Sequence, residues 1–174
     1  FRFWQYGEWV EVVVDDLLPS RAGRPIYVTS DDRGEMWPCL VEKAYAKLNG
    51  SYQHLEGGWP VAAMVDFTGG FPETHGLEDR RPLSLLGEDL FPLLWEAMAP
   101  PGTCVCVSSL LDSSMGIYGK HAYTVLGVRE GQGGVPRLVR VRNPWGSSKE
   151  WRGAWGKRSR ELSSLPPAAR AGDI

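Results

Sequence analysis

Two strand-forming segments joined by a glycine-rich stretch constrain the fold of this chain more than any other feature. Residues 121–128 (HAYTVLGV) and residues 137–142 (RLVRVR) are rich in the β-branched and aromatic residues that strands favour. The stretch between them contains Gly131, Gly133 and Gly134, and glycine readily adopts the positive backbone angles that tight turns require. The pattern predicts an antiparallel hairpin.

The register of this hairpin follows from the position of its turn. A turn centred on Gln132 gives three directly opposed pairs, which are Val125 with Val139, Tyr123 with Val141, and His121 with Asn143. Directly opposed residues share one face of a sheet, with Cβ atoms about 4.5–5.5 Å apart. The apolar face would then end in a His beside an Asn, while Thr124, Arg140 and Arg142 occupy the polar face. A one-residue slip would mix these two sets, and Pro144 ends the second strand because proline lacks a backbone donor.

A His beside an Asn at the end of a strand has two interpretations. It is either a hydrogen-bonded pair that closes the hairpin or a general base with its orienting partner. A His near neutrality can deprotonate a nucleophile, and a neighbouring side-chain carbonyl fixes its tautomer, as in the Cys-His-Asn arrangement of cysteine proteases. Spacing alone leaves both interpretations open.

The rest of the chain predicts an α+β fold with antiparallel strands and flanking helices. Asp32 and Glu35 resemble a capping box, and apolar residues then recur at helical spacing until Asn49-Gly50 ends the helix. Further strands are expected at 9–14, 26–29 and 104–108, and further helices near 61–65 and at 88–98. The tail from residue 159 to residue 174 is expected to be a loop with a weak helical tendency.

Composition excludes several classes of function. A length of 174 residues fits one domain, and a net charge of −2 gives no electrostatic basis for binding nucleic acid or an anionic membrane. The sequence contains no apolar run of 18 residues, so no transmembrane segment is expected, and its start has no signal-peptide pattern. Because the sequence begins with Phe1 and not with methionine, it is expected to be a piece of a longer protein. Cys39, Cys104 and Cys106 form no CxxC pair, which argues against a disulfide framework or a zinc site and favours a reducing, cytoplasmic compartment.

Several motifs in order resemble one known family. His121-Ala122-Tyr123, then residues 140–146 (RVRNPWG) and residues 150–155 (EWRGAW), are similar to the second subdomain of the calpain catalytic core. Four upstream segments resemble the same subdomain in the same order, namely residues 7–12 (GEWVEV), 15–19 (DDLLP), 42–52 (EKAYAKLNGSY) and 66–70 (DFTGG). The resemblance implies a papain-like β half over residues 1–174, without the subdomain that carries the nucleophilic cysteine.

The resemblance also implies roles for individual residues. His121 matches the family's general base, Asn143 the residue that orients its imidazole, and Trp145 a tryptophan that shields the pair from water. The family's nucleophile lies in a Gln-Gly-x-x-Gly-Asp-Cys-Trp-like segment, which is absent here, so none of the three cysteines is expected to be nucleophilic. Of the other histidines, His54 and His75 lie in loop-like stretches and are expected to be ordinary surface residues.

The function expected from this resemblance is part of a calcium-dependent cysteine endopeptidase that is inactive without its Cys-bearing half. That half and protein substrates are the expected partners. The alternative is a non-enzymatic calpain-like scaffold or regulatory homologue.

Calcium is the cofactor that the resemblance implies, but this sequence departs from the family pattern. Glu150 matches an acidic calcium ligand, with one extra residue before it, while Lys157 stands where an Asp ligand is expected. The remaining ligands would come from a strand near Gly172-Asp173. Calcium takes six to eight oxygen ligands, and an ammonium both removes a ligand and repels the ion, which argues against calcium binding in this half.

Overall fold

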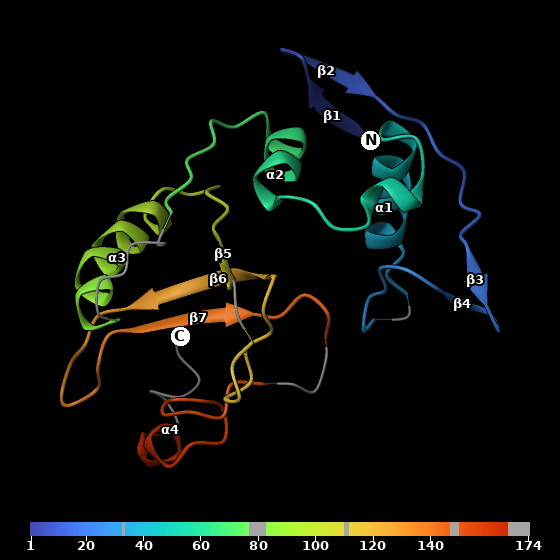
Figure 1. Ribbon diagram of the computed structural model, residues 1–174. Helices are drawn as coiled ribbons and strands as arrows, with labels where there is room; N and C mark the ends of the chain where they lie inside the picture. Colours follow the sequence, from blue (N-terminus) through green and yellow to red (C-terminus); the bar gives the residue numbers. More distant parts are fainter. Residues whose placement is uncertain (33, 77–82, 110–111, 147–149, 167–174) are drawn as a thin grey trace. The chain divides into compact units, whose positions relative to one another are not determined.

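The computed structural model describes residues 1–32, 34–76, 83–109, 112–146 and 150–166, and for residues 83–89 it describes the backbone alone (Figure 1). The chain divides into two compact units, Phe1–His75 and Gly76–Ile174. Helices and antiparallel sheets of two or three strands occur together, which confirms the predicted α+β fold class.

The first unit combines two short hairpins with helices. Its elements are β1 (Arg2–Gln5), β2 (Glu8–Glu11), β3 (Ser20–Arg21), β4 (Arg24–Pro25), α1 (Trp37–Leu48), the 3₁₀ helix η1 (Tyr52–Leu55) and α2 (Pro60–Thr68). β1 pairs with β2 and β3 pairs with β4, both antiparallel. Tyr6 and Gly7 join the first hairpin with φ angles of 51° and 92°, the left-handed geometry that two-residue hairpin turns use.

The core of the first unit forms around Phe3, whose side chain is 1% exposed. Its ring lies 5.5 Å from that of Tyr45 in α1 and 5.2 Å from that of Phe67 in α2, measured between centroids. Tyr45 donates a 2.7 Å hydrogen bond from its hydroxyl to Asp66. Burial, together with this carboxylate, raises the pKa of Tyr45 to about 12. The rings therefore hold β1, α1 and α2 together.

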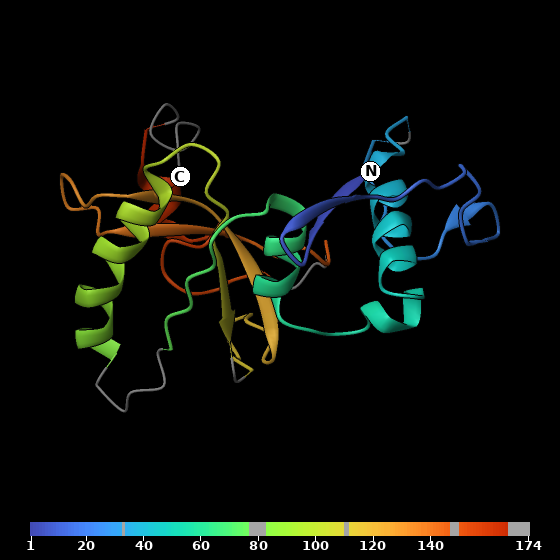
Figure 2. The same cartoon turned by 90° about the horizontal axis from the view of Figure 1, so that it is seen from above.

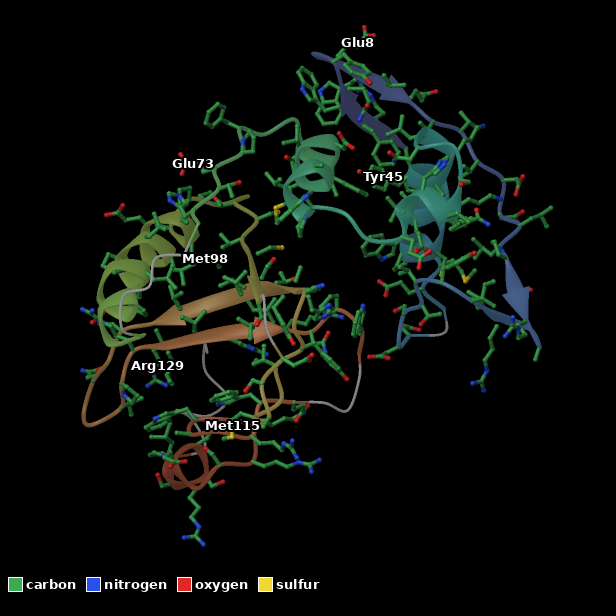
Figure 3. All side chains as sticks on the ribbon, in the orientation of Figure 1. Glu8, Tyr45, Glu73, Met98, Met115 and Arg129 are labelled. Carbon is green, nitrogen blue, oxygen red and sulfur yellow. The ribbon has the colours of Figure 1, made fainter. Side chains whose placement is uncertain are left out.

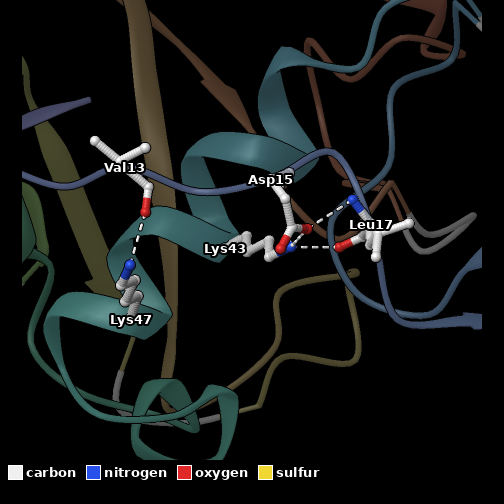
Figure 4. A network of polar contacts seen from close by, with 5 residues as sticks. All are labelled: Val13, Asp15, Leu17, Lys43 and Lys47. Atoms are coloured by element: carbon white, nitrogen blue, oxygen red, sulfur yellow. Dashed lines mark hydrogen bonds and ion pairs between the residues drawn. The ribbon is translucent and has the colours of Figure 1, made fainter.

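Two lysines of α1 attach the irregular segment that follows β2. Lys47 donates to the carbonyl of Val13 at 2.8 Å, while Lys43 contacts both the Asp15 carboxylate and the Leu17 carbonyl (Figure 4). The hydrogen bond from Lys43 lowers the pKa of Asp15. Backbone carbonyls outside regular structure are thus hydrogen-bonded by lysine side chains of α1.

The second unit is a three-stranded antiparallel sheet with helices. Its elements are α3 (Leu83–Met98), β5 (Cys106–Ser109), β6 (His121–Arg129), β7 (Leu138–Arg142) and α4 (Arg160–Ser164). The strand order is β5-β6-β7, so β6 is central, and α3 contacts it (Figure 2). Phe91 and Leu94 of α3 are buried, while Tyr123 and Val125 are the buried residues of β6 next to His121.

Several expected elements differ in extent. The predicted capping box is wrong, because α1 begins at Trp37 without a side-chain cap, and Glu35 instead accepts a bond from the Trp37 indole. The strand expected at 9–14 ends at Glu11, and the strand expected at 26–29 is absent. In the latter, the backbone N–H of Val28 donates to Glu42 and its carbonyl accepts from Cys39, so side chains use the groups that a neighbouring strand would need.

Three other elements are found with shifted bounds. The short helix expected near 61–65 covers Pro60–Thr68, and the helix expected at 88–98 begins earlier, at Leu83. The strand expected at 104–108 covers Cys106–Ser109. In the tail, α4 is a short helix capped by the Ser159 hydroxyl, and residues 167–174 lie outside the described part of the chain.

The predicted hairpin of β6 and β7 is present, but the predicted register is wrong. Its turn lies at Gly133 and Gly134, with φ angles of 60° and 86°, because Gln132 and Val135 exchange both backbone hydrogen bonds. The observed pairs are Arg129 with Leu138, Val128 with Val139, Gly127 with Arg140, Val125 with Val141, and Thr124 with Arg142. Leu126 is left without an opposed residue, which makes a β-bulge.

The bulge explains why the predicted faces are right although the pairs are wrong. His121 lies eleven positions before Gln132, and Asn143 lies eight positions after Val135. Side chains alternate along a strand, so an odd and an even count would turn the two residues to opposite faces. The extra residue at Leu126 removes one position from the longer count and returns His121 and Asn143 to one face.

Replacing Phe3 tests the core of the first unit. Phe3→Ala should lower the free energy of unfolding by about 3–5 kcal/mol, since it removes a fully buried ring that packs on two helices. Urea denaturation measures this. Phe71→Ala is the matched control, because Phe71 is 91% exposed and its loss should change stability by less than about 0.5 kcal/mol. Equal effects of the two substitutions would contradict this description of the core.

Candidate active site

The site begins with a hydrogen bond between His121 and Asn143. His121 is the first residue of β6 and is 7% exposed, and its Nε2 lies 2.8 Å from Oδ1 of Asn143. Continuing the observed register places Asn143 opposite Tyr123, so the contact with His121 is diagonal, which long side chains can bridge. The structure therefore brings the two predicted residues together.

A second bond to Asn143 fixes the tautomer of His121. The backbone N–H of Trp145 donates to the same Oδ1 at 3.1 Å, which requires the amide oxygen, and not its nitrogen, at that position. An amide oxygen only accepts, so Nε2 of His121 must carry the proton. The neutral imidazole then has its basic lone pair on Nδ1, and none of the described residues bonds that atom.

Three aromatic rings surround the imidazole, and we call them the aromatic cage (Tyr118, Tyr123 and Trp145). Their centroids lie 5.8, 4.9 and 3.9 Å from that of His121, the two tyrosines being edge-to-face. Trp145 also contacts Tyr118 at 5.1 Å. Trp145 is 64% exposed, so it covers His121 with one face and shows the rest of its surface to solvent.

Local backbone geometry places His121 and Trp145. Lys120 has a φ of 51°, a left-handed conformation that non-glycine residues rarely adopt, directly before His121. Directly after β7, Pro144 follows Asn143, and the bond from Trp145 N–H back to the Asn143 side chain forms an Asx turn. The turn carries Trp145 over the imidazole, which explains why Asn, Pro and Trp stand in this order.

Two of the three cysteines, Cys39 and Cys106, lie in settings that do not activate a thiol. Cys39 is buried in the first unit and donates to the carbonyl of Val28. Cys106 pairs with Thr124 in the sheet, and its burial, with Cys104 nearby, raises its pKa. A raised pKa keeps the thiol protonated at neutral pH, and the thiolate is the nucleophilic form.

The other two histidines are exposed. His54 lies with Nδ1 2.8 Å from the carbonyl oxygen of Asn49, and His75 lies 3.7 Å from Glu73. Neither belongs to the group of residues around His121.

The residues present do not fit a calcium ion at Glu150. The ammonium of Lys157 lies 3.4 Å from the Glu150 carboxylate, so a positive charge already stands beside the one predicted acidic ligand that the structure describes. Within the described ranges, no group of three or more His, Cys, Asp or Glu side chains could hold a metal. Gly172 and Asp173 lie outside the described residues.

Comparison with known proteins identifies the family. A model of calpain family cysteine proteases matches residues 1–172. This chain belongs to the calpain family. It is 41% identical to the calpain-2 catalytic subunit of Mus musculus over 98% of this chain and 25% of that protein. The calpain-1 catalytic subunit of Sus scrofa is 41% identical over 98% of this chain and 24% of its own length.

The calpain-2 catalytic subunit of Homo sapiens is 40% identical over 98% of this chain and 25% of its length. The chain therefore spans about a quarter of the curated relatives that it matches. In the part of the chain that the structure describes, no helix combines the length and apolar character needed to cross a membrane.

The sequence identified three of the five side chains in this site. His121, Asn143 and Trp145 were expected, while Tyr118 and Tyr123 were not assigned to it. Tyr123 could have been found, because it follows His121 by two positions on one strand and so shares its face. Tyr118 lies in a loop, where no sequence periodicity indicates its direction.

Replacing Glu150 tests the misfit to calcium. Glu150→Gln in the full-length protein should leave the number of calcium ions bound per chain unchanged, because the Glu150 carboxylate is already paired with Lys157. Equilibrium dialysis with radioactive calcium measures this number. The loss of one ion per chain would show that Glu150 is a calcium ligand after all.

Proposed function

We propose that this chain is the His- and Asn-bearing half of a calpain-type cysteine endopeptidase. One observation carries the proposal: in a member of the calpain family, Nε2 of His121 is bonded to Asn143, and this leaves Nδ1 as the basic nitrogen. In this proposal His121 is the general base, Asn143 orients its imidazole, and Trp145 shields the pair from water.

The reaction would proceed through a covalent intermediate on a cysteine of the other half. Nδ1 of His121 accepts the thiol proton, and the resulting thiolate attacks the carbonyl carbon of a peptide bond. The imidazolium then donates that proton to the leaving amine as the C–N bond breaks, which leaves an acyl-enzyme. His121 next takes a proton from water, the hydroxide attacks the thioester, and the proton returns to the cysteine sulfur as the carboxylic acid is released.

Two features of the site support this role. The bond to Asn143 holds the imidazole in a single tautomer, so the basic nitrogen always faces the same direction. The aromatic cage restricts rotation of the ring and keeps water from one side of it. An imidazolium formed during the reaction keeps its Nε2–H bond to an amide oxygen, which stabilises the charged state.

The proposed partners follow from what the chain does not contain. A nucleophile must come from a Cys-bearing subdomain, so the chain alone should hydrolyse no peptide, and protein substrates would bind between the two halves. We place the protease in the cytoplasm, in line with three free cysteines. Calcium dependence is proposed for the whole protease, with no contribution from Glu150 in this half.

Substituting His121 tests the proposed base. In the full-length protein, His121→Gln should lower peptide hydrolysis by about 10²–10⁴-fold, the usual contribution of general acid–base catalysis. It should also abolish labelling by a thiol-directed peptidyl epoxide. His54→Gln is the matched control, since His54 is an exposed histidine bonded to a backbone carbonyl, and it should retain wild-type rates.

The same experiment separates protease from scaffold. Labelling and hydrolysis that are lost in His121→Gln but kept in His54→Gln support the protease. Absence of labelling in the folded wild-type protein, with and without calcium, would overturn the proposal in favour of a non-enzymatic homologue. Labelling without calcium would keep the protease and remove its calcium dependence.

A further inference from the structure

We propose that Tyr118 is a positioning residue for His121, and that Gly116 fixes the loop that carries Tyr118. The loop covers residues 112–119, and we call it the positioning loop. This inference rests on the proposed role of His121. It adds a second way in which the imidazole is held in position, by the aromatic cage in addition to Asn143.

The positioning loop is held together by hydrogen bonds between its own residues. Its hydrogen bonds are Ser113 N to Ile117 O at 2.8 Å, Met115 N to Ser113 Oγ at 3.0 Å, Gly116 N to Ser113 O at 3.1 Å, and Gly119 N to Asp112 Oδ1 at 3.1 Å. Four bonds within eight residues give the loop a defined shape, so a displacement at one end moves the other.

Gly116 attaches this loop to the segment that follows β7. The glycine is buried, has a φ of +109°, and lies so close to Glu150 that an added Cβ would be 2.0 Å from its carbonyl oxygen. Arg152 completes the attachment, because its N–H donates to Met115 O at 2.7 Å and its guanidinium to Ser114 O at 2.8 Å. Figure 3 shows Met115 beside this segment. Any side chain at position 116 would therefore force the backbone of the loop or of Glu150 to shift.

The segment that contacts the positioning loop, residues 150–156, also has a constrained backbone. The indole N–H of Trp151 donates to the carbonyl of Ala154 at 2.9 Å. An added Cβ at Gly153 would lie 2.2 Å from the Trp151 ring, and one at Gly156 would lie 2.6 Å from the Trp151 carbonyl oxygen. The chain therefore folds tightly around one tryptophan and gives Gly116 a fixed surface.

Tyr118 connects the positioning loop to the imidazole. Its backbone N–H donates to the Tyr123 hydroxyl at 2.8 Å, and its ring contacts both His121 and Trp145. Tyr118 thus contacts the imidazole itself and both other members of the aromatic cage. Moving the loop would let the imidazole and Trp145 rotate, and a displacement of about 1 Å can lower a rate by as much as 10²-fold.

Gly116→Ala tests the attachment, with Gly134→Ala as the matched control. Both substitutions add a methyl group at a left-handed glycine, since φ is +86° at Gly134, but nothing lies within 4 Å of a Cβ there. In the full-length protein, Gly116→Ala should lower kcat by about 10–100-fold with KM unchanged. Gly134→Ala should change kcat by less than about twofold, because position 134 also has a positive φ but lacks the clash.

A readout that does not depend on catalysis is the tautomer of His121. Its ¹⁵N chemical shifts, identified by their loss in His121→Gln, should indicate the Nε2–H form in the wild-type protein and in Gly134→Ala. Gly116→Ala should lower the Nε2–H fraction. Unchanged shifts in Gly116→Ala would overturn the proposal, even in a protein that hydrolyses nothing, so this failure is distinct from failure of the proposed function.

Substituting Tyr118 keeps the proposal testable if Gly116→Ala does not fold. Tyr118→Leu should reproduce the fall in kcat and in the Nε2–H fraction, while Tyr118→Phe should keep both near wild type, because the proposal assigns the role to the ring. Wild-type values in Tyr118→Leu, or equal losses in Tyr118→Phe, would contradict it.

Discussion

A single hydrogen bond of 2.8 Å joins His121 to Asn143 at the open end of the β6–β7 hairpin. That bond forms only if both side chains leave the sheet on the same face and at neighbouring positions. The turn at Gly133-Gly134, the bulge at Leu126 and the left-handed backbone at Lys120 all determine whether this happens. The chemistry of two side chains thus depends on backbone geometry spread over more than twenty residues.

Much of this hairpin could be predicted from sequence, but its register could not. Strand propensity and the glycines were enough to predict two strands, a turn and the face that carries His121. Three glycines near the turn offered several centres, and the choice of Gln132 shifted every pair. The bulge has no sequence signal of its own, because Leu126 stands in an ordinary run of strand residues. The contact between His121 and Asn143 was predicted and is present, while their catalytic roles remain predictions.

Side-chain bonds to distant backbone groups account for the other differences. Val28 looked like part of a strand, but Glu42 and Cys39 of α1 occupy its backbone groups. Lys43 and Lys47 do the same for the segment after β2, and Arg152 does so for the positioning loop. Such bonds satisfy backbone groups that no strand or helix would satisfy. They join residues far apart in sequence, so neither propensity nor periodicity can indicate them.

The bulge at Leu126 also limits how the hairpin can vary in length. Loss of one residue from β6 would leave a regular ladder with His121 and Asn143 still on one face. Loss of two, with the ladder again regular, would turn them to opposite faces unless β7 also changed by one. Homologous hairpins with an intact pair should therefore differ in length in a coordinated way, with gains or losses in one strand matched by a bulge or by the other strand. Whether the two residues share a face depends on whether the numbers of residues between them and the turn are both odd or both even. The bulge lets β6 contain one residue more than a regular ladder with this arrangement would have.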